Sequence, residues 1–563
     1  MAAKNKKSKL ERIKEESDNL RGSIAEELGS ELPNFSKKAY QLLKFHGTYQ
    51  QDDRDKRDGK DKEHIFMVRC RIPGGGLTAD QYLAHDDLAT RYADNTLRIT
   101  TRQTFQFHGV VKDNLKHTLK GINDALVTTL GACGDVVRNV MCNPAPSSDG
   151  LQQQVQRYAN ELSELLLPET NAYHEIWLDG EKISNNRQEV KNNGEPLYGS
   201  NYLPRKFKIG IATPKDNSID VYTQDIGLIA IPENGLIKGF NITVGGGMGM
   251  HHKKPETFPR LGDDMGYVPV DQLVPVVKAI IEVQRDFGDR KDRKQARMKY
   301  LIHQWGLDTF QKEVEKRLGY SLQAFKPLPE FEMDLYLGWG EQPDGNWYYG
   351  LSVENGRIKD TQDMKMKTGI RKAVEEFRTG IRLTANHDII FTDIKQEEKE
   401  AFISRLKAHA IPLPEEKSNA VKYSMACPAM PTCGLAITES ERALPSIIRD
   451  IEKELDNLGL QNETITVRMT GCPNGCARPY VADIGFVGRS LDQYSIFIGG
   501  DPAGTRLNSR FKDLVNKEEL VQEIRPLLIR YKEQSRQNES FSDYWNRVGL
   551  EYAPNYQSEA AAS

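Results

Sequence analysis

The sequence contains two copies of one long pattern, and this duplication constrains the fold more than any other feature. The clearest match pairs LRITTRQTFQFHGV, beginning at Leu97, with IRLTANHDIIFTDI, beginning at Ile381. LPRKFKIGIA and QDIGLIAI likewise correspond to VRMTGCPNGCA and ADIGFVG, and FNITVGGG corresponds to YSIFIGGD. Because these matches keep the same order, they indicate a diverged internal repeat rather than chance similarity.

Both copies mix strand-like and helical patterns. IFMVRCRI and WYYGLSVENGRI are rich in strand-forming residues, whereas TADQYLAHDDLATRYA and MKTGIRKAVEEF show helical spacing of apolar residues. We therefore expect an α+β fold built from two modules related by a pseudo-two-fold axis, with mixed sheets and helices in each.

Composition limits the classes of function. The 563 residues include 77 basic and 80 acidic side chains, and a net charge of −3 argues against a nucleic-acid-binding protein or general attraction to anionic membranes. The N-terminus lacks the apolar stretch of a signal peptide, and no apolar run reaches the length of a membrane span. We expect a cytoplasmic protein with reduced thiols. Residues 1–64 are rich in charge, which predicts a solvated extension or linker, and NLRGSIAEELGS within them is a candidate short helix lying on the body of the protein.

Four of the seven cysteines form two close pairs, in ACPAMPTC and in TGCPNGC. Grouped thiolates select iron–sulfur clusters, zinc or copper(I), and four cysteines are the usual ligands of a [4Fe–4S] cluster. Structural zinc sites use tighter pairs in small modules, so zinc is the weaker alternative, together with four buried small side chains. The cluster ligands predicted are Cys427, Cys433, Cys472 and Cys476. Cys70, Cys133 and Cys142 are expected in the core or in a pocket.

Basic residues gather in the first module on short strands and loops. They are Arg69, Arg71, Arg98, Arg102, Arg138, Arg205, Lys206 and Lys208. Strand alternation places Lys206 and Lys208 on one face and Phe207 on the other. A solvated strand edge would explain one such pair, but several in one module favour a pocket for a polyanionic cofactor and a small anionic substrate. His108 alone is more typical of a structural histidine, and NITVGGG allows close approach of the backbone to a bulky cofactor.

The duplication aligns the KFK segment of the first copy with the cysteine pair of the second. This alignment predicts that the anion pocket and the metal centre are two versions of one loop facing a shared site.

Taken together, these segments resemble the sirohaem nitrite and sulfite reductase family, and within it the haemoprotein (beta) subunits of assimilatory NADPH-dependent enzymes. The resemblance covers about residues 12–550 and rests on RCRIPGG, RITTRQTFQFHG, RNVMC, YLPRKFK, NITVGGGMG, DRKQARMKY, ACPAMPTC and MTGCPNGCARP. It implies a [4Fe–4S] cluster on the four paired cysteines, with Cys476 also bridging to the sirohaem iron.

The resemblance also implies roles for the basic residues. Sulfite would be bound by Arg69, Arg138, Lys206 and Lys208. We expect Lys206 and Lys208 to be the main proton donors. The sirohaem carboxylates would be contacted or neutralised by Arg98, Arg102, Gln106, His108, Arg205 and Lys299. The implied domains are a ferredoxin-like (parachute) domain at 65–131 plus 333–408, a sirohaem and substrate domain at 132–332, and an iron–sulfur and sirohaem domain at 409–563.

The activity implied is the six-electron reduction of sulfite to sulfide. Nitrite reductases of the family tend to lack one lysine of the K-x-K pair, and this chain keeps both Lys206 and Lys208. Nitrite reduction, a haem-free iron–sulfur electron-transfer protein and a zinc-structured binding module remain alternatives. No flavin or NADPH motif is evident, so electrons must come from a partner. The resemblance implies a flavoprotein reductase subunit that uses NADPH, with ferredoxin as the alternative.

Overall fold

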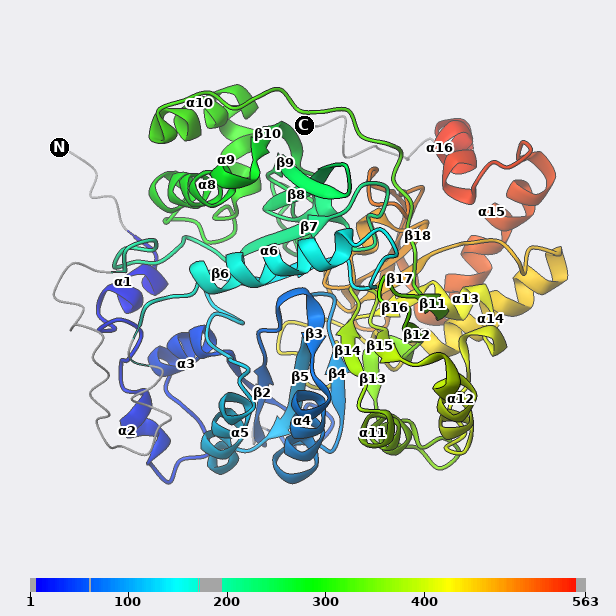
Figure 1. The fold of residues 1–563 in the computed structure, drawn as a ribbon, viewed down its shortest axis with the longest axis horizontal. Coiled ribbons are helices and arrows are strands. Elements are labelled where there is room, and N and C mark those ends of the chain that lie inside the picture. The colour runs from blue at the N-terminus through cyan, green and yellow to red at the C-terminus, as the bar shows by residue number, and fades with distance from the viewer. Residues whose placement is uncertain (1–6, 60–61, 171, 173–194, 553–563) are drawn as a thin grey trace.

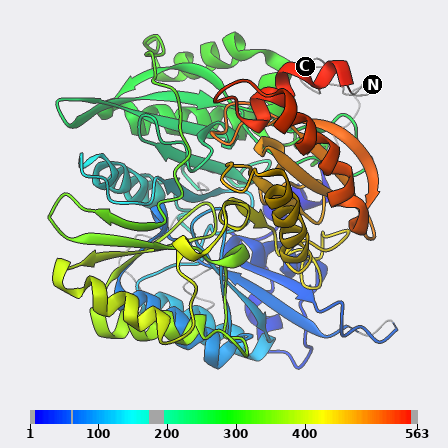
Figure 2. The ribbon, with the colours of Figure 1, turned by 90° about the vertical axis from the view of Figure 1, so that its right-hand side faces the viewer.

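The computed structural model describes residues 7–59, 62–170, 172 and 195–552. In this part of the chain the strands form four five-stranded sheets, which fall into two pairs of like topology. Figure 2 shows the first pair, blue and yellow-green, in the lower half of the molecule and the second pair, green and orange, in the upper half. The arrangement confirms the α+β prediction and its duplicated modules.

The sheets of the first pair are antiparallel and exchange a strand. One has the order β1 (Thr48–Asp52), β2 (His64–Arg69), β5 (Phe105–Val110), β4 (Leu97–Ile99), β13 (Arg357–Ile358). The other has the order β11 (Gly338–Glu341), β12 (Trp347–Leu351), β15 (Ile389–Ile394), β14 (Gly380–Leu383), β3 (Gly76–Leu77). Strands β13 and β3 each complete the sheet of the opposite copy, so neither copy forms its whole sheet alone.

Helices cover one side of this first pair of sheets. They are α4 (Ala79–Tyr92), α5 (Lys112–Asp124), α11 (Met366–Phe377) and α12 (Lys399–Lys407), along the lower edge of Figure 1. Helix α4 begins with a capping box, in which Thr78 Oγ1 accepts from the backbone N–H of Gln81 and the Gln81 side chain accepts from that of Thr78. The helical patterns of the sequence are therefore present where expected.

The sheets of the second pair share one order, with three parallel strands followed by two antiparallel ones. The first contains β6 (Val137–Cys142), β7 (Phe207–Ala212), β8 (Ile226–Glu233), β9 (Leu236–Val244) and β10 (Asp263–Pro269). The second contains β16 (Ser424–Ala426), β17 (Val467–Thr470), β18 (Ile484–Ser490), β19 (Gln493–Ile498) and β20 (Ser509–Asn516).

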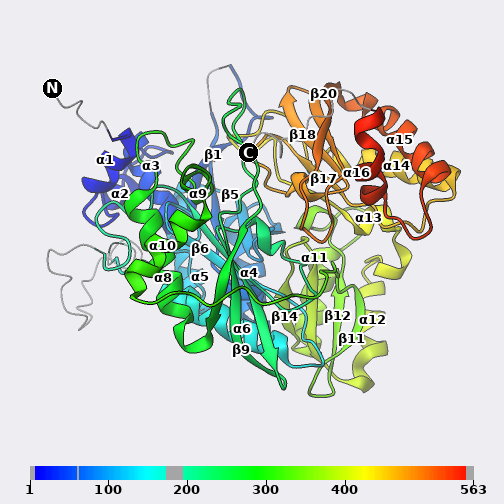
Figure 3. The same ribbon diagram turned by 90° about the horizontal axis from the view of Figure 1, so that it is seen from above.

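Separate groups of helices pack on these two sheets (Figures 1 and 3). With the first sheet go α6 (Leu151–Leu165), α8 (Leu273–Phe287), α9 (Met298–Trp305) and α10 (Leu307–Leu318). With the second go α13 (Asn419–Lys422), α14 (Leu444–Leu458), α15 (Leu520–Gln534) and α16 (Phe541–Tyr552). No helix in the described part of the chain is both long and apolar enough to cross a bilayer.

The N-terminal segment is packed against the body of the protein. It forms α1 (Lys9–Glu15), α2 (Ile24–Leu28), α3 (Lys37–Leu43) and β1. Ile24, Leu43 and Phe45 are buried in the main hydrophobic core, and β1 pairs with β2 from Thr48 to Asp52. The prediction of a solvated extension is therefore wrong for the segment as a whole, because a few apolar side chains among many charges suffice to anchor three short helices on the body of the protein. The candidate helix in NLRGSIAEELGS is present as α2.

Candidate functional site

The two cysteine loops leave the same edge of a sheet. Cys427 and Cys433 follow β16, and Cys472 and Cys476 follow β17. Since β16 and β17 are parallel neighbours, their carboxyl ends and the loops after them lie together. None of the four cysteines forms a disulfide. Burial raises the pKa of the Cys427 thiol well above its ordinary value, and the nearby Cys476 and Cys472 raise it further. The four sulfurs therefore share one site.

The loops supply N–H groups to the sulfurs, and the loop after β17 leaves no room for a side chain at Gly475. The backbone N–H of Gly471 donates to Cys427 Sγ at 3.4 Å, and Asn474 Nδ2 donates to Cys472 Sγ at 3.4 Å. Gly475 has a φ of +62°, and a Cβ there would lie 2.8 Å from the Tyr480 ring. Such N–H donors stabilise sulfur that carries negative charge, as in an iron–sulfur cluster.

A single metal ion does not fit this set of sulfurs. Among the residues that the structure describes, no three histidine, cysteine or acidic side chains are close enough to bind one ion. A zinc ion needs ligands at about 2.0–2.3 Å. A cluster of four irons spreads its cysteine ligands further apart, so the donor set fits a [4Fe–4S] cluster better than structural zinc.

Cys476 differs from the other cysteines in its exposure. All seven are described, and Cys476 alone is exposed, although Gly475 and Ala477 on either side are buried. Thr101 Oγ1, in the loop between β4 and β5, donates to the Cys476 carbonyl at 3.0 Å. The Cys476 sulfur also lies close enough to Arg69 and Lys206 to act on the pKa values of both, although burial and neighbouring cations lower that of Lys206 overall. The thiol thus faces open space beside the basic residues of the first module.

The two lysines of the K-x-K segment are placed to bind an anion. Phe207 between them is fully buried, as strand alternation predicts, while Lys206 and Lys208 are half-buried. Within the described residues, neither ammonium group has a hydrogen bond or ion pair. Burial lowers the pKa of Lys206 to about 7, helped by the positive charges of Arg205 and Arg297. Burial likewise lowers that of Lys208, helped by Arg102 and Lys206. Partly buried cations that form no ion pair favour an anionic ligand.

Arginines beside these lysines are held by backbone carbonyls. Arg138 Nε donates to Gly134 O at 2.9 Å and its Nη1 to Ala132 O at 3.0 Å. Arg102 donates to Gln224 Oε1 at 2.8 Å, yet its buried Nε has no partner among the residues that the structure describes. Arg69 Nη1 donates to Cys133 Sγ at 3.3 Å. Because carbonyls and a thiol leave the positive charge uncompensated, these arginines add to the attraction for an anion.

Comparison with known proteins agrees with this geometry. The sequence matches the family described as "Nitrite and sulphite reductase 4Fe-4S domain" over residues 158–322 and 418–554. It also matches the "Nitrite/Sulfite reductase ferredoxin-like half domain" over residues 57–125 and 340–409. The chain belongs to the nitrite and sulfite reductase family.

Individual relatives cover nearly the whole chain. A sulfite reductase (NADPH) hemoprotein beta-component of Staphylococcus haemolyticus is 46% identical over 96% of this chain and 95% of its own length. A sulfite reductase (ferredoxin) of Synechococcus elongatus is 44% identical over 100% of this chain and 93% of its own length. Among solved structures, the NirA protein of Mycobacterium tuberculosis superposes with a TM-score of 0.79 at 23% identity, over 95% of each chain, which shows a shared fold.

Four residues that the family resemblance assigns to sirohaem contacts already have protein partners. Arg98 Nε donates to Glu441 at 2.8 Å and its Nη2 to Ala426 O at 2.8 Å, next to Cys427. Lys299 donates to the carbonyls of Gly247, Gly249 and Phe258. His108 and Gln106 are buried and contact each other at 3.2 Å. Because an ammonium has three protons, these three carbonyls occupy all of the hydrogen-bond donors of Lys299, which thereby holds the glycine-rich loop.

The predicted equivalence of KFK and the cysteine loop is wrong. The backbone N–H of Lys208 donates to Asp225 at 2.9 Å, and that of Thr466 donates to Asp483 at 2.8 Å. Both aspartates directly precede the third strand of their sheets, so Lys208 corresponds to Thr466, before β17, and not to Cys472 after it. The short sequence match aligned apolar strand residues without fixing the strand ends. Packing of the two halves, not equivalence, brings Lys206 near Cys476.

Sequence reasoning missed several residues that hold the site together. Arg297 pairs with Asp225 at 2.8 Å beneath Lys208, and Glu441 joins Arg98 to Arg357. Arg297 lies in the DRKQARMKY segment that carries the family resemblance, so a signal for it was present. Glu441 lies outside every such segment. Its partners Arg98 and Arg357 are 343 and 84 residues away along the chain, which no local pattern reveals.

Proposed function

We propose that this chain is the haemoprotein of an assimilatory sulfite reductase, which reduces sulfite to sulfide with six electrons. The observation that carries the proposal is the exposed thiol of Cys476 beside the unpaired ammonium groups of Lys206 and Lys208. A cluster ligand and a cationic anion site thus meet at one open space. The names of the relatives, both NADPH- and ferredoxin-dependent sulfite reductases, support the same activity.

We assign the cofactors to the residues that fit them. Cys427, Cys433, Cys472 and Cys476 would hold a [4Fe–4S] cluster, and Cys476 would also hold the sirohaem. When bound, the sirohaem and the cluster supply electrons and a site for the sulfur atom. Arg102 and Arg205 are the arginines we assign to the sirohaem carboxylates, while Arg98, Gln106, His108 and Lys299 shape the surrounding loops.

The protein's own part in the reaction is binding and protonation. Arg69 and Arg138 hold the sulfite oxygens through their guanidinium groups. Lys206 and Lys208 donate protons, directly or through water, to each oxygen that leaves; every S–O cleavage consumes two electrons and two protons and releases one water. A pKa of about 7 allows Lys206 to release a proton near neutral pH and to take one back from solvent.

The absorption spectrum of the purified protein tests the cofactor assignment. Sirohaem gives Soret and red bands, a cluster alone gives a broad brown shoulder, and zinc gives no colour. We expect sirohaem bands together with four irons beyond the haem iron per chain. Colourless, zinc-loaded protein would rule the proposal out.

Sulfite is the preferred substrate over nitrite in this proposal, because both lysines of the K-x-K pair are present. Two positive charges bind a dianion more strongly than a single one does. Lys208→Ala separates binding from protonation. We expect a lower rate at saturating sulfite as well as weaker binding. An unchanged saturated rate would remove Lys208 from the role of proton donor.

We propose a flavoprotein subunit that takes electrons from NADPH as the donor, with ferredoxin as the alternative. Sulfide formation with each purified donor distinguishes them.

We further propose a cytoplasmic location, since reduced thiols suit cluster ligation. We also propose three domains, at 65–131 plus 333–408, at 132–332 and at 409–563. The matched family segments at 57–125 plus 340–409, 158–322 and 418–554 support this division.

A further inference from the structure

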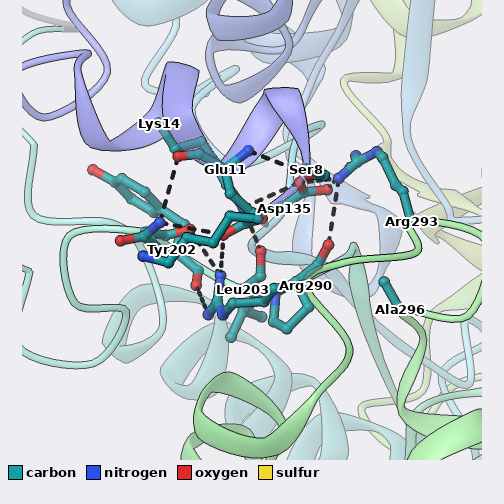
Figure 4. Close-up of polar contacts among 12 residues, drawn as sticks. Ser8, Glu11, Lys14, Asp135, Tyr202, Leu203, Arg290, Arg293 and Ala296 are labelled. Atoms are coloured by element: carbon teal, nitrogen blue, oxygen red, sulfur yellow. Dashed lines mark hydrogen bonds and ion pairs between the residues drawn. The ribbon is translucent and has the colours of Figure 1, made fainter. Parts of the chain in front are cut away.

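Helix α1 carries two charged side chains into the interior of the protein. Glu11 and Lys14 are each 1% exposed, on a helix of only seven residues. Charges buried in this way are costly unless they are paired and hydrogen-bonded. Figure 4 shows the pairing: the two side chains point into a group of polar contacts made by segments from three other parts of the chain.

Lys14 joins α1 to the two segments that carry the anion-site residues. Its ammonium lies 2.5 Å from Glu11 Oε1, donates to Leu203 O at 2.9 Å and lies 3.6 Å from Asp135 Oδ2. Leu203 is three residues before Lys206, and Asp135 is three residues before Arg138. The backbone N–H of Leu203 also donates to Asp135 O at 2.9 Å, so the two segments are fixed to each other at the point where Lys14 contacts both.

A second set of contacts joins α1 to the loop before α9. Arg290 forms an ion pair with Glu11 and donates to Tyr202 O at 2.7 Å, while the backbone N–H of Ser8 donates to Arg290 O at 3.1 Å. Arg293 contacts both oxygens of Asp135, at 2.7 and 2.8 Å. The same loop leads to Arg297, whose ion pair with Asp225 lies beneath Lys208.

We propose that α1 is a positioning element of the anion site, and that Lys14 is its central residue. Lys14 fixes the Asp135 and Leu203 segments directly, and its partners Glu11 and Asp135 hold the third segment through Arg290 and Arg293. Together these contacts set the spacing between Lys206, Arg138 and Arg297. Neither Lys14 nor Glu11 touches the anion. The inference rests on the proposed function only in taking sulfite as that anion.

The chemistry of the contact favours positioning over simple coverage of the core. Apolar side chains would cover the core at no desolvation cost, and well-packed apolar residues often replace a buried ion pair without loss of stability. Directed contacts from one ammonium to a carbonyl and two carboxylates instead fix the relative position of the segments that bear them.

Lys14→Met tests the proposal in the cofactor-loaded enzyme, with Lys9→Met as the matched control. Lys9 lies on the exposed face of the same helix. With a reduced dye as electron donor, we expect Lys14→Met to raise the KM for sulfite about fivefold or more while kcat falls less than about twofold. Lys9→Met should match the parent in both constants.

Amide hydrogen exchange gives a readout that does not depend on activity. In Lys14→Met, exchange should quicken in residues 131–138, 201–206 and 288–297 and stay unchanged in the cysteine loops. Arg293→Gln loosens the same network from its outer side, where the side chain is 33% exposed, so folding should survive. It should raise KM in the same direction by a smaller factor.

Unchanged KM and unchanged exchange in both Lys14→Met and Arg293→Gln would overturn the proposal, and so would an equal effect of Lys9→Met. Failure of the proposed function looks different. In that case the parent itself would form no sulfide, while the exchange experiment would still report whether Lys14 holds the three segments.

Discussion

At the scale of single residues, the site combines thiols that need a cluster with cations that need an anion. Lys206 shows the cost of this arrangement, because its ammonium is half-buried beside other positive groups and forms no ion pair within the described part of the chain. Burial and the charges of Arg205 and Arg297 lower its pKa to about 7. Such a group destabilises the protein without its ligands, and the binding of an anion removes part of that destabilisation.

Lys206→Met should therefore stabilise the cofactor-free protein while abolishing most sulfite reduction. The folded-state pKa lies below the ordinary value of 10.5, so the charged form is disfavoured in the folded state. The penalty is full below about pH 7 and fades as pH rises toward 10.5. We expect a gain of about 1–3 kcal/mol in unfolding free energy at pH 6 and a smaller gain at pH 9, measured by urea unfolding. A gain that grows with pH would contradict this account.

Cys476→Ser should remove the cluster and the sirohaem together, because we assign one sulfur to both. Iron and acid-labile sulfide analysis, combined with the absorption spectrum, measures both losses. Cys70→Ser is the control: this fully buried cysteine lies outside the site, so cofactors should stay while stability falls by about 1–3 kcal/mol. If Cys476→Ser kept its sirohaem, the residue that holds the haem would be one other than Cys476.

At the scale of elements, strands and helices with strong local patterns were predictable and their pairing was not. Helices α4 and α11 lie where apolar spacing predicts them. The exchange of β3 and β13 between sheets depends on strand pairs such as Arg357 with Arg98. These two residues are 259 positions apart in the sequence, so local spacing does not reveal their pairing. The same limit explains the error over KFK, where strand interiors match but strand ends do not.

Gly475 is a position where one loop must accept a positive φ. Gly475→Ala places a Cβ 2.8 Å from the Tyr480 ring and 3.2 Å from Met248 O, with φ at +62°. We expect a loss of about 1–3 kcal/mol and reduced cluster content per chain. Gly434→Ala, in the other cysteine loop, has no atom within 4 Å of its Cβ and should keep full iron content. Equal iron content in the two variants would show that the Gly475 turn is not required.

At the scale of the whole molecule, a buried ion cluster joins the two duplicated halves. Asp220 and Arg478 occupy corresponding positions, each in a left-handed conformation just before a short 3₁₀ turn. Asp220 Oδ2 lies 2.8 Å from Arg478 Nε and 3.0 Å from Arg468 Nη1, and all three side chains are buried. The sequence shows that there are two copies, but not which residues meet between them.

Asp220→Asn should weaken the contact between the halves strongly. It leaves two buried arginines without a carboxylate, which costs about 3–5 kcal/mol. Asp513→Asn breaks an ion pair with Arg489 at the surface, where the partners are 34% and 24% exposed, and should cost under about 1 kcal/mol. Thermal or urea unfolding compares the two; similar losses would mean that the buried cluster contributes little.

The most direct test of the whole account is the electron stoichiometry of sulfide formation under anaerobic conditions. The purified, cofactor-loaded chain is given sulfite and a reduced one-electron dye, and dye oxidised is measured against sulfide formed. We predict six electrons consumed for each sulfide released, with a higher kcat/KM for sulfite than for nitrite. Dye oxidation without sulfide, or a preference for nitrite, would contradict the assignment.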